Sequence, residues 1–484
     1  MSSSDGREII SVDYIQKPSE KALMSPSLAA IVFCVGIMGL LLLDRERKVR
    51  TSWALWLPVM WLLIAGSRHV SAWLGTAPVG SPEQYLEGSP VDATVYGLLL
   101  GAGITVLFGR RRIVTSLLNR NWPILIFVLY CAISITWSDY PGVALKRWIK
   151  SLGDYTMVLI LLTEHDREHA VKRALAMAAC VLLPLSILFI KYYPDLGRAY
   201  ASHWDGTQFF VGVADTKNML GMVCLVFGFA ASWRFLQAYC GVRPDRIGGL
   251  VVHGTVVAMA IWLLILSDSK TSLSCFVLTV GLIAAHIFFK MARKRVAIHL
   301  LVAVVVLTCF SVLFLGIGTG ALQTMGRNPT LTGRTDIWDI LLRVPINPVI
   351  GTGFESFWLG ERLARLWTFP IVNGINEAHN GYLEVYLNLG WVGIALLTRL
   401  VWTGYKNILS LLERDPEAGR LRLGFFVIAM VYNFTEAAIR STDLVWIAFV
   451  LAITAMPERT LARVAKTRRT ATAVGEVEQL VLAD

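Results

Sequence analysis

The sequence predicts an all-α fold, a polytopic transmembrane helical bundle of about twelve or thirteen spans with one long loop that contains short helices. Hydrophobic residues make up 55% of the 484 positions and the mean hydropathy is +0.58, which exceeds what a soluble core needs. The apolar stretches are long and rich in Leu, Ala, Gly and Trp, without the alternation of strands. Membrane-spanning helices fit this pattern better than an outer-membrane barrel.

The apolar stretches give the elements in chain order. A helix crosses the hydrocarbon core with about 20 apolar residues, fewer when its ends are short. The candidate spans are 27–43, 53–66, 92–108, 122–137, 151–163, 171–190, 218–236, 248–267, 271–289, 296–317, 381–403, 421–439 and 442–456. The stretch 53–66 contains Pro58 and is the least typical of a span.

Positive charge alternates between the two sides of these spans. Of the 45 Lys and Arg residues, 27 fall in one set of alternate loops and the C-terminal tail, and 14 fall in the other set. The positive-inside rule therefore makes the first set cytoplasmic and turns the second set outward. The net charge of +11 follows this pattern, and the absence of a basic stripe with interleaved aromatics excludes nucleic acid as a partner.

These assignments divide the chain into five parts. They are a polar N-terminal tail (1–26), transmembrane helices (27–317), a periplasmic loop (318–380), further transmembrane helices (381–456) and a cytoplasmic tail (457–484). The loop is longer than a connector needs, and such loops are commonly functional. Its aromatic residues, including Trp338, Trp358 and Trp367, predict that it is folded, with short helices at 335–344 and 355–366.

The sequence predicts neither a metal site nor a cofactor. No Walker loop, Rossmann fingerprint, Gly-x-Ser-x-Gly elbow or Asp-rich metal motif is present. The seven cysteines fall inside or at the ends of apolar spans and are expected to be small packing residues. His165 and His169 have a helical ligand spacing but lie in a predicted cytoplasmic loop, where a solvated pair is the expected reading.

His379 is the first candidate for catalysis. It lies where the long loop meets an apolar span, with Glu377 before it and Asn380, Tyr382 and Glu384 after it. An imidazole titrates near pH ~6.5, so a histidine at a water–lipid boundary can serve as a general base toward a lipid-linked substrate. The alternative is a boundary histidine that only hydrogen-bonds a headgroup or a carbonyl.

Cations on the same predicted side are candidates for binding an anionic headgroup. Arg334 follows Gly333 in the loop, and its planar guanidinium suits a pyrophosphate, although a solvated loop cation is the alternative. Lys270 lies between two spans, where it either lines a cavity or pairs with Asp268. Further candidates for substrate binding are Lys217, Asn218, Arg147, Asn380 and Tyr382.

The ordered motifs resemble those of the O-antigen ligase and Wzy-type polymerase superfamily, and within it the ExoQ-like exopolysaccharide polymerisation proteins. The motifs are Trp137-Ser138 to Lys146-Arg147, Gly212 to Lys217-Asn218 and Gly221, Ser267 to Thr271, Gly333-Arg334 to Trp338, Asn347-Pro348 to Gly353-Phe354, and His379-Asn380 to Gly393. They cover residues 120–400, and Asn433-Phe434-Thr435-Glu436 extends the likeness. Lys270 stands where many family ligases carry an arginine, which keeps the charge but loses bidentate geometry.

The resemblance implies a metal-independent glycosyltransferase of the bacterial inner membrane that polymerises exopolysaccharide on the periplasmic face. Its donor would be an undecaprenyl-pyrophosphate-linked oligosaccharide, and its acceptor another glycan. His379 would be the base and Arg334 would hold the pyrophosphate. A chain-length regulator and export proteins are candidate partners. The alternatives are an O-antigen ligase acting on lipid A core, a transporter of lipid-linked oligosaccharide, and a structural subunit of an export complex.

Overall fold

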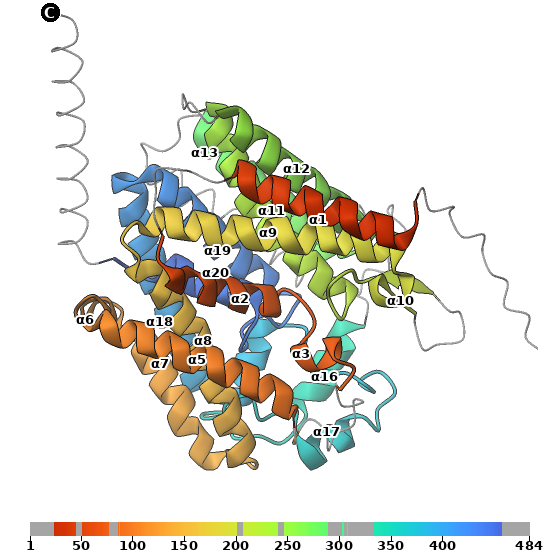
Figure 1. The fold of residues 1–484 in the computed structure, drawn as a ribbon. Coiled ribbons are helices and arrows are strands. Elements are labelled where there is room, and N and C mark those ends of the chain that lie inside the picture. The colour runs from red at the N-terminus through yellow and green to blue at the C-terminus, as the bar shows by residue number, and fades with distance from the viewer. Residues whose placement is uncertain are drawn as a thin grey trace, which may run out of the picture.

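The computed structural model describes residues 24–44, 51–76, 88–200, 207–240, 246–288 and 333–456, together with positions 86, 303 and 307. The tails 1–23 and 457–484, and the predicted span 296–317 apart from two positions, lie outside these ranges. Within them the chain is almost entirely helical, as the sequence predicts (Figure 1). The two strands are short, β1 (Arg198–Tyr200) and β2 (Gln208–Phe210), and they pair antiparallel.

The helices before the long loop contribute to one shared hydrophobic core. In chain order they are α1 (Pro26–Leu43), η1 (Trp53–Leu55), α2 (Trp56–Ala65), α3 (Val70–Trp73), α5 (Pro90–Gly109), α6 (Arg111–Arg120), α7 (Trp122–Ile133), η2 (Ser134–Trp137), α8 (Pro141–Thr163), α9 (Arg167–Tyr192), α10 (Pro194–Gly197), α11 (Lys217–Cys240), α12 (Arg246–Leu266) and α13 (Lys270–Phe288). The remainder are α16 (Arg334–Leu342), α17 (Gly360–Leu366), α18 (Gly381–Arg414), α19 (Pro416–Tyr432) and α20 (Leu444–Ile453).

Burial is greatest in the middle of the bundle and least at its apolar periphery. In α11, 78% of the apolar window is buried inside the protein, whereas in α1 only 6% is buried. Figure 1 shows α1 on the outside of the group that contains α9, α11 and α12. An apolar helix that leaves Ile31, Val35 and Leu42 exposed needs an apolar solvent, which the bilayer supplies.

Seven helices among the described residues are long and apolar enough to cross a membrane, or eight if the bent pair α6 and α7–η2 is one span. The seven are α1, α5, α9, α11, α12, α13 and α18. Predicted spans at 53–66, 442–456 and 421–439 fall on α2 with η1, α20 and α19, which are shorter than 18 residues. The protein is therefore a polytopic helical membrane protein.

The described part of the long loop folds on its own small core. Leu341 of α16, Leu363 of α17 and Phe357, which precedes α17, are fully buried in it. The helix α16 matches the helix predicted at 335–344, but α17 begins later than the predicted 355–366. The delay has a backbone cause, since Glu355 and Gly360 both have positive φ and interrupt helical geometry.

A break in the helical backbone of α18 lets the helix pack against the turn at 347–353 of the long loop. Gly390 has φ 64° and ψ −164°, a conformation that is essentially restricted to glycine. The break lets Trp391 and Val392 donate backbone hydrogen bonds to Pro348 and Val349. Those two bonds fasten the turn at 347–353 to the helix that begins at the candidate site.

We expect Gly390→Ala to destabilise the protein strongly. A Cβ at this position would lie 2.3 Å from the carbonyl carbon and oxygen of Val349, and the backbone strain alone costs about 1–3 kcal/mol. The matched control is Gly281→Ala in α13, where a Cβ meets nothing within 4 Å. Thermal unfolding of the purified variants checks this. Equal melting temperatures for Gly390→Ala and the wild type would contradict it.

Candidate functional site

The candidate site begins where the long loop enters α18. His379 has φ 48°, in the left-handed region where histidine is found more readily than most residues. The Asn380 side chain then accepts hydrogen bonds from the backbone N–H groups of Tyr382 and Leu383 and caps the helix. This turn aims the imidazole away from the helix axis. The His379-Asn380 motif thus specifies the turn and the N-terminal cap at the start of α18.

A second segment, residues 433–440, packs directly against this turn. The backbone N–H of Gly381 donates to the carbonyl oxygens of Asn433 (2.9 Å) and Glu436 (3.0 Å). A Cβ at Gly381 would lie only 2.0 Å from Asn433 Oδ1, so the approach requires glycine. It brings the loop after α19 beside His379.

Five side chains from these segments and α16 form what we call the charged cluster: Arg334, Glu377, His379, Glu436 and Arg440. His379 Nδ1 lies 3.0 Å from Glu377 Oε1 and 3.5 Å from Glu436 Oε2. Arg334 binds the other oxygen of Glu436 at 2.7 Å, and Arg440 binds the other oxygen of Glu377 at 2.7 Å. The charges therefore alternate, with the imidazole in the centre and a guanidinium at each end.

The cluster changes the proton affinity of its central group. Burial opposes the charged imidazole, but the contacts and charges of Glu377 and Glu436 outweigh burial and raise the pKa of His379 to about 9. Burial likewise opposes the charge of Glu377, but Arg440 and His379 lower its pKa to about 2. At neutral pH the imidazole is therefore protonated. Nδ1 is buried, and neither carboxylate contact has ideal hydrogen-bond geometry.

The same residues resemble a metal-binding set. One ligand atom each from Glu377, His379 and Glu436 lies within 4.8 Å of the others. The two carboxylates, however, already bind Arg334 and Arg440, which supply positive charge where a divalent ion would supply it. The donor set thus fits a protonated imidazole between two anions better than a metal ion.

A network behind the cluster holds the loop to α18. The Glu384 carboxylate accepts hydrogen bonds from the Ala378 N–H and from the indole N–H of Trp358. Asn388, one turn later, donates to Glu384 and accepts from the backbone N–H groups of Ser356 and Phe357. Ala378 is held from its other side as well, because its carbonyl accepts from the Trp338 indole at 2.8 Å. These bonds fix the position of His379.

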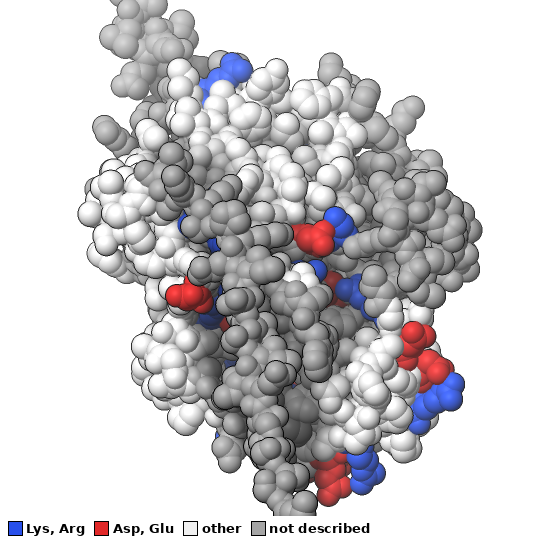
Figure 2. Space-filling model, turned by 90° about the vertical axis from the view of Figure 1, so that its right-hand side faces the viewer, with Lys and Arg blue, Asp and Glu red and all other residues white. Residues whose placement is uncertain are grey.

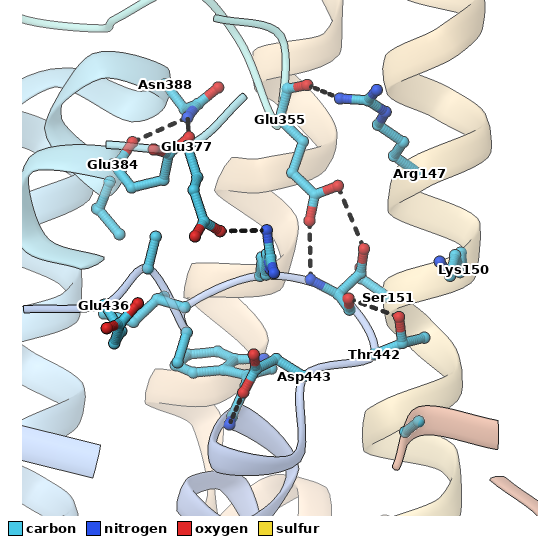
Figure 3. Close-up of a pocket in the computed structure, with 18 of the residues that line it drawn as sticks. Arg147, Lys150, Ser151, Glu355, Glu377, Glu384, Asn388, Glu436, Thr442 and Asp443 are labelled. Carbon is cyan, nitrogen blue, oxygen red and sulfur yellow. Dashed lines mark hydrogen bonds and ion pairs between the residues drawn. The ribbon is translucent and has the colours of Figure 1, made fainter. Parts of the chain in front are cut away.

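A cavity of about 710 Å³ opens beside the charged cluster. Glu377, Glu436 and Arg440 line it, and Figure 3 shows Arg147 and Lys150 on α8, on the side opposite Glu384 and Asn388 of α18. Deeper walls are apolar and include Phe127, Cys131, Trp148, Tyr155, Met222 and Trp446. Charged groups and a long apolar wall in one cavity suit an amphipathic ligand.

His69 lines the same cavity but differs from His379 in its proton affinity. The surrounding protein removes water from the imidazole, which disfavours its charged form and lowers the pKa of His69 to about 4. The positive charge of Lys150 lowers it further. His69 is therefore neutral at pH 7 and a weak base. Of these two histidines, His379 is the stronger base.

The predicted binding residues divide into groups. Arg334 and His379 meet through Glu436, whereas Arg147 lies across the cavity and donates to the Glu355 carbonyl. Lys217 and Lys270 share Asp268, at 4.0 Å and 2.6 Å, at the N-termini of α11 and α13. A hydrogen bond of 3.0 Å between Thr271 and Thr435 joins the start of α13 to the segment that carries Glu436.

Two predicted binding residues have other contacts. Asn380 is buried as the cap of α18, and the Tyr382 hydroxyl donates to the Met430 carbonyl at 2.8 Å. These contacts position His379 and dock α18 on α19, and substrate binding by Asn380 and Tyr382 stays a prediction. Of the predicted site residues, Arg147 and Asn218 line the cavity, whereas the other six, Asn380, Tyr382, His379, Arg334, Lys217 and Lys270, are not among its lining residues.

Comparison with known proteins finds a family model and several relatives that match this chain. The family model for O-antigen ligase matches residues 255–398, which include Lys270, Arg334 and His379. The exopolysaccharide production protein ExoQ of Rhizobium meliloti is 29% identical over 356 residues, 70% of this chain and 77% of that protein. The chain is thus similar to the O-antigen ligase family over residues 255–398 and to an exopolysaccharide production protein over most of its length. Its own helices make it a multi-span membrane protein.

Two further relatives show similar coverage at lower identity. "Putative polysaccharide ligase RP358" of Rickettsia prowazekii is 23% identical over 66% of this chain and 77% of its own length. "Putative polysaccharide ligase RT0347" of Rickettsia typhi is 24% identical over 66% of this chain and 76% of its own length. The relatives thus include proteins named for polysaccharide production and for polysaccharide ligation.

Sequence reasoning missed three members of the charged cluster. In the sequence Glu377 stands out only as a neighbour of His379 and Glu436 only as part of a motif, while Arg440 is one of the 14 cations on the predicted outward side. A signal existed for Glu436, because its motif extends the likeness to the O-antigen ligase family beyond α18. No local pattern reveals that Arg440 and Glu377 pair, since they come from different segments of the chain.

Proposed function

We propose that this protein is a polysaccharide polymerase that transfers glycan repeat units from an undecaprenyl-pyrophosphate donor to an acceptor glycan. The observation that supports it is the charged cluster, in which two carboxylates, each held by an arginine, surround a strongly basic histidine beside an amphipathic cavity. We place the reaction at the periplasmic face of the inner membrane, without a metal ion, in exopolysaccharide biosynthesis. This side carries the long loop in the charge-based topology.

The proposed step is a displacement at the anomeric carbon. The acceptor hydroxyl oxygen forms a bond to that carbon while the bond to the pyrophosphate oxygen breaks, and the lipid pyrophosphate leaves with the bonding electrons. His379 takes the hydroxyl proton on Nε2, because Nδ1 faces Glu377 and Glu436. The two carboxylates then stabilise the imidazolium, as the aspartate does in a catalytic triad. Attack from the opposite face inverts the anomeric centre.

The pyrophosphate would be bound beside the cluster. Arg334 is the first residue of α16, and its side chain belongs to the charged cluster. A guanidinium there can stabilise the charge that the leaving group gains. Lys217 and Lys270 stand at the N-termini of α11 and α13, where helix dipoles also favour anions. Both lysines are partly exposed and carry one more positive charge than Asp268 offsets. The apolar wall of the cavity would receive the start of the polyprenyl chain.

We expect the pH profile of kcat/KM to report the titration of His379. The folded-state pKa is raised from 6.5 to about 9, so the neutral base is scarce at pH 7, about one molecule in a hundred, and increases as the pH rises through 9. The rate should therefore climb between pH 7 and 9 and level off above it. Glu377→Gln removes one stabilising anion, lowers this pKa and moves the climb to lower pH.

The control for that profile is Glu361→Gln. Glu361 lies on α17 and pairs with Arg365 at the exposed surface, so its loss leaves the charged cluster intact. Its profile should match the wild type. A rate that falls as the pH rises from 7 to 9 would mean that the protonated imidazole is the active form, and it would exclude the base role.

Reconstitution tests the function as a whole. The purified full-length protein in liposomes receives a synthetic undecaprenyl-pyrophosphate oligosaccharide, and product length is followed with and without chelator. A ladder of products longer by one repeat unit each, unchanged by chelator, supports the proposal. Loss of products in chelator would instead assign a metal to Glu377, His379 and Glu436. Intact donor with no transfer, but with movement of the donor across the bilayer, would indicate a transporter.

An O-antigen ligase that transfers the glycan to lipid A core is the second candidate. The two Rickettsia relatives named as polysaccharide ligases favour it. The same chemistry serves both functions, so the acceptor decides between them. Adding lipid A core oligosaccharide to the reconstituted protein separates them: a single transfer to that acceptor, without a ladder, identifies the ligase.

A further inference from the structure

A second site with a different charge pattern lies at the junction of α6 and α7. The axes of α6 and of the following segment Trp122–Trp137 differ in direction by 88°. If the second segment crosses the membrane, α6 lies close to the membrane plane. Figure 1 shows α6 at the edge of the bundle beside α7. Its sequence has arginines at both ends and Ile113, Val114, Leu117 and Leu118 between them, which is typical of a helix at the membrane interface.

A cavity of about 350 Å³ opens at this junction, between α6, α7, α18 and α20. It is lined by Asn119, Arg120, Asn121, Trp122, Pro123, Ile124, Arg399, Thr403, Asn407 and Ile453. The lining contains two arginines and four other side chains with an amide or hydroxyl group, and it contains no acidic residue. In this respect it differs from the cavity beside the charged cluster, where acids neutralise the cations.

The walls of this cavity are fixed by hydrogen bonds. The buried Asn121 side chain donates to the carbonyls of Leu117 (2.8 Å) and Ala455 (2.9 Å) and accepts from the Ala455 N–H at 2.7 Å. Asn407 donates to the Ile453 carbonyl at 3.3 Å. The bend and the end of α20 are thereby held together, so the cavity is a defined part of the fold.

The two arginines remain available for a ligand. Arg399 lies over the Trp122 ring at 5.0 Å, and within the described ranges neither it nor Arg120 has an ion-pair partner. A guanidinium stacked on an aromatic ring is oriented in advance for a planar anion such as phosphate. Thr403 and Asn407 extend the polar face of α18 by one turn each beyond Arg399.

We propose that this cavity binds the phosphate of an anionic phospholipid, such as phosphatidylglycerol, from the leaflet on the predicted cytoplasmic side. The position supports a lipid, since Arg399 lies on a candidate membrane span and α6 carries a basic, amphipathic sequence next to it. Tryptophan and arginine together are typical of a helix end at headgroup level. Inorganic phosphate offers the same anionic oxygens but has no acyl chains to occupy the apolar side of α6.

Native mass spectrometry of the full-length protein in detergent tests the proposal, with phosphatidylglycerol and phosphatidylcholine as probes. We expect phosphatidylglycerol to be retained preferentially, and Arg399→Gln and Arg120→Gln each to weaken its binding about fivefold. The matched control is Lys406→Gln. Lys406 is an exposed lysine of α18 that lies over the Trp402 ring, outside the cavity. This variant should bind as the wild type does.

Three outcomes would overturn the proposal. They are equal retention of phosphatidylcholine, unchanged binding in the Arg120→Gln, Arg399→Gln double variant, and displacement of phosphatidylglycerol by millimolar inorganic phosphate. The last would make the cavity a site for a soluble anion. Thermal unfolding of each variant in detergent without added lipid checks that the fold is intact. None of these measurements depends on transferase activity.

Discussion

Replacing His379 by Ala should abolish glycan transfer. General bases contribute about 10²–10⁴-fold to rate, and here the imidazole is the proposed proton acceptor for the hydroxyl. It lies within 3.5 Å of both carboxylates that would stabilise its charge. Product formation by the reconstituted variant, compared with the wild type at pH 9, measures the loss. His165→Ala, at an exposed position before α9, is the control and should retain full activity.

A second variant separates chemistry from backbone geometry. His379 has φ 48°, which asparagine tolerates better than alanine, so His379→Asn keeps the turn with less strain but cannot take the proton. Both variants should be inactive, while the asparagine variant should unfold at a higher temperature than the alanine variant. Full polymer production by His379→Asn would exclude the base role and favour a transporter.

Replacing Arg334 by Ala should also abolish polymer formation, while protein level and membrane insertion stay normal. The change removes a proposed pyrophosphate ligand, and it leaves Glu436 without its guanidinium. Arg334→Lys should recover part of the activity at most, because lysine lacks the planar fork. Arg343→Ala, on the exposed side of the same helix, is the control. Polymer length in cells and transfer in liposomes measure both effects.

A double variant distinguishes the two roles of Arg334. Glu436→Gln removes the charge that Arg334 neutralises, so combining it with Arg334→Ala restores the balance of the cluster. If Arg334 only neutralises Glu436, the double variant regains activity. If Arg334 binds pyrophosphate, the double variant stays inactive and its KM for donor rises. Normal activity of Arg334→Ala alone would sink the pyrophosphate role.

The sequence predicts the fold well wherever one segment contains the signal. Uninterrupted apolar stretches predict α1, α5, α9, α11, α12 and α13 to within about four residues. The sequence does not predict a helix break or a helix start that depends on contact with another segment of the chain. The break at Gly390 depends on the approach of Val349, and the late start of α17 depends on the turn at Glu355. Apolar composition alone also does not distinguish the shorter helices α2 and α20 from full spans.

The candidate site is predictable in the same uneven way. His379 and Arg334 each stand in a recognisable motif, and both belong to one cluster. Their partners Glu377, Glu436 and Arg440 could not be paired from the sequence, because ion pairs between distant segments follow from tertiary packing. For the same reason the sequence does not reveal that Asn380 caps α18 or that Tyr382 hydrogen-bonds α19 through the Met430 carbonyl.

Because Gly381 contacts the segment 433–440, the charged cluster is completed late in the synthesis of the chain. His379 precedes α18, whereas Glu436 and Arg440 follow α19, so the ribosome delivers the base two helices before it delivers its second carboxylate. A nascent chain that ends after α18 holds His379 with Glu377 alone. Glu377 already raises the pKa of His379, and the further contribution of Glu436 is added only when the segment after α19 packs against the turn. Incomplete chains would thus meet the lipid-linked sugar pool around them with only part of the charged cluster.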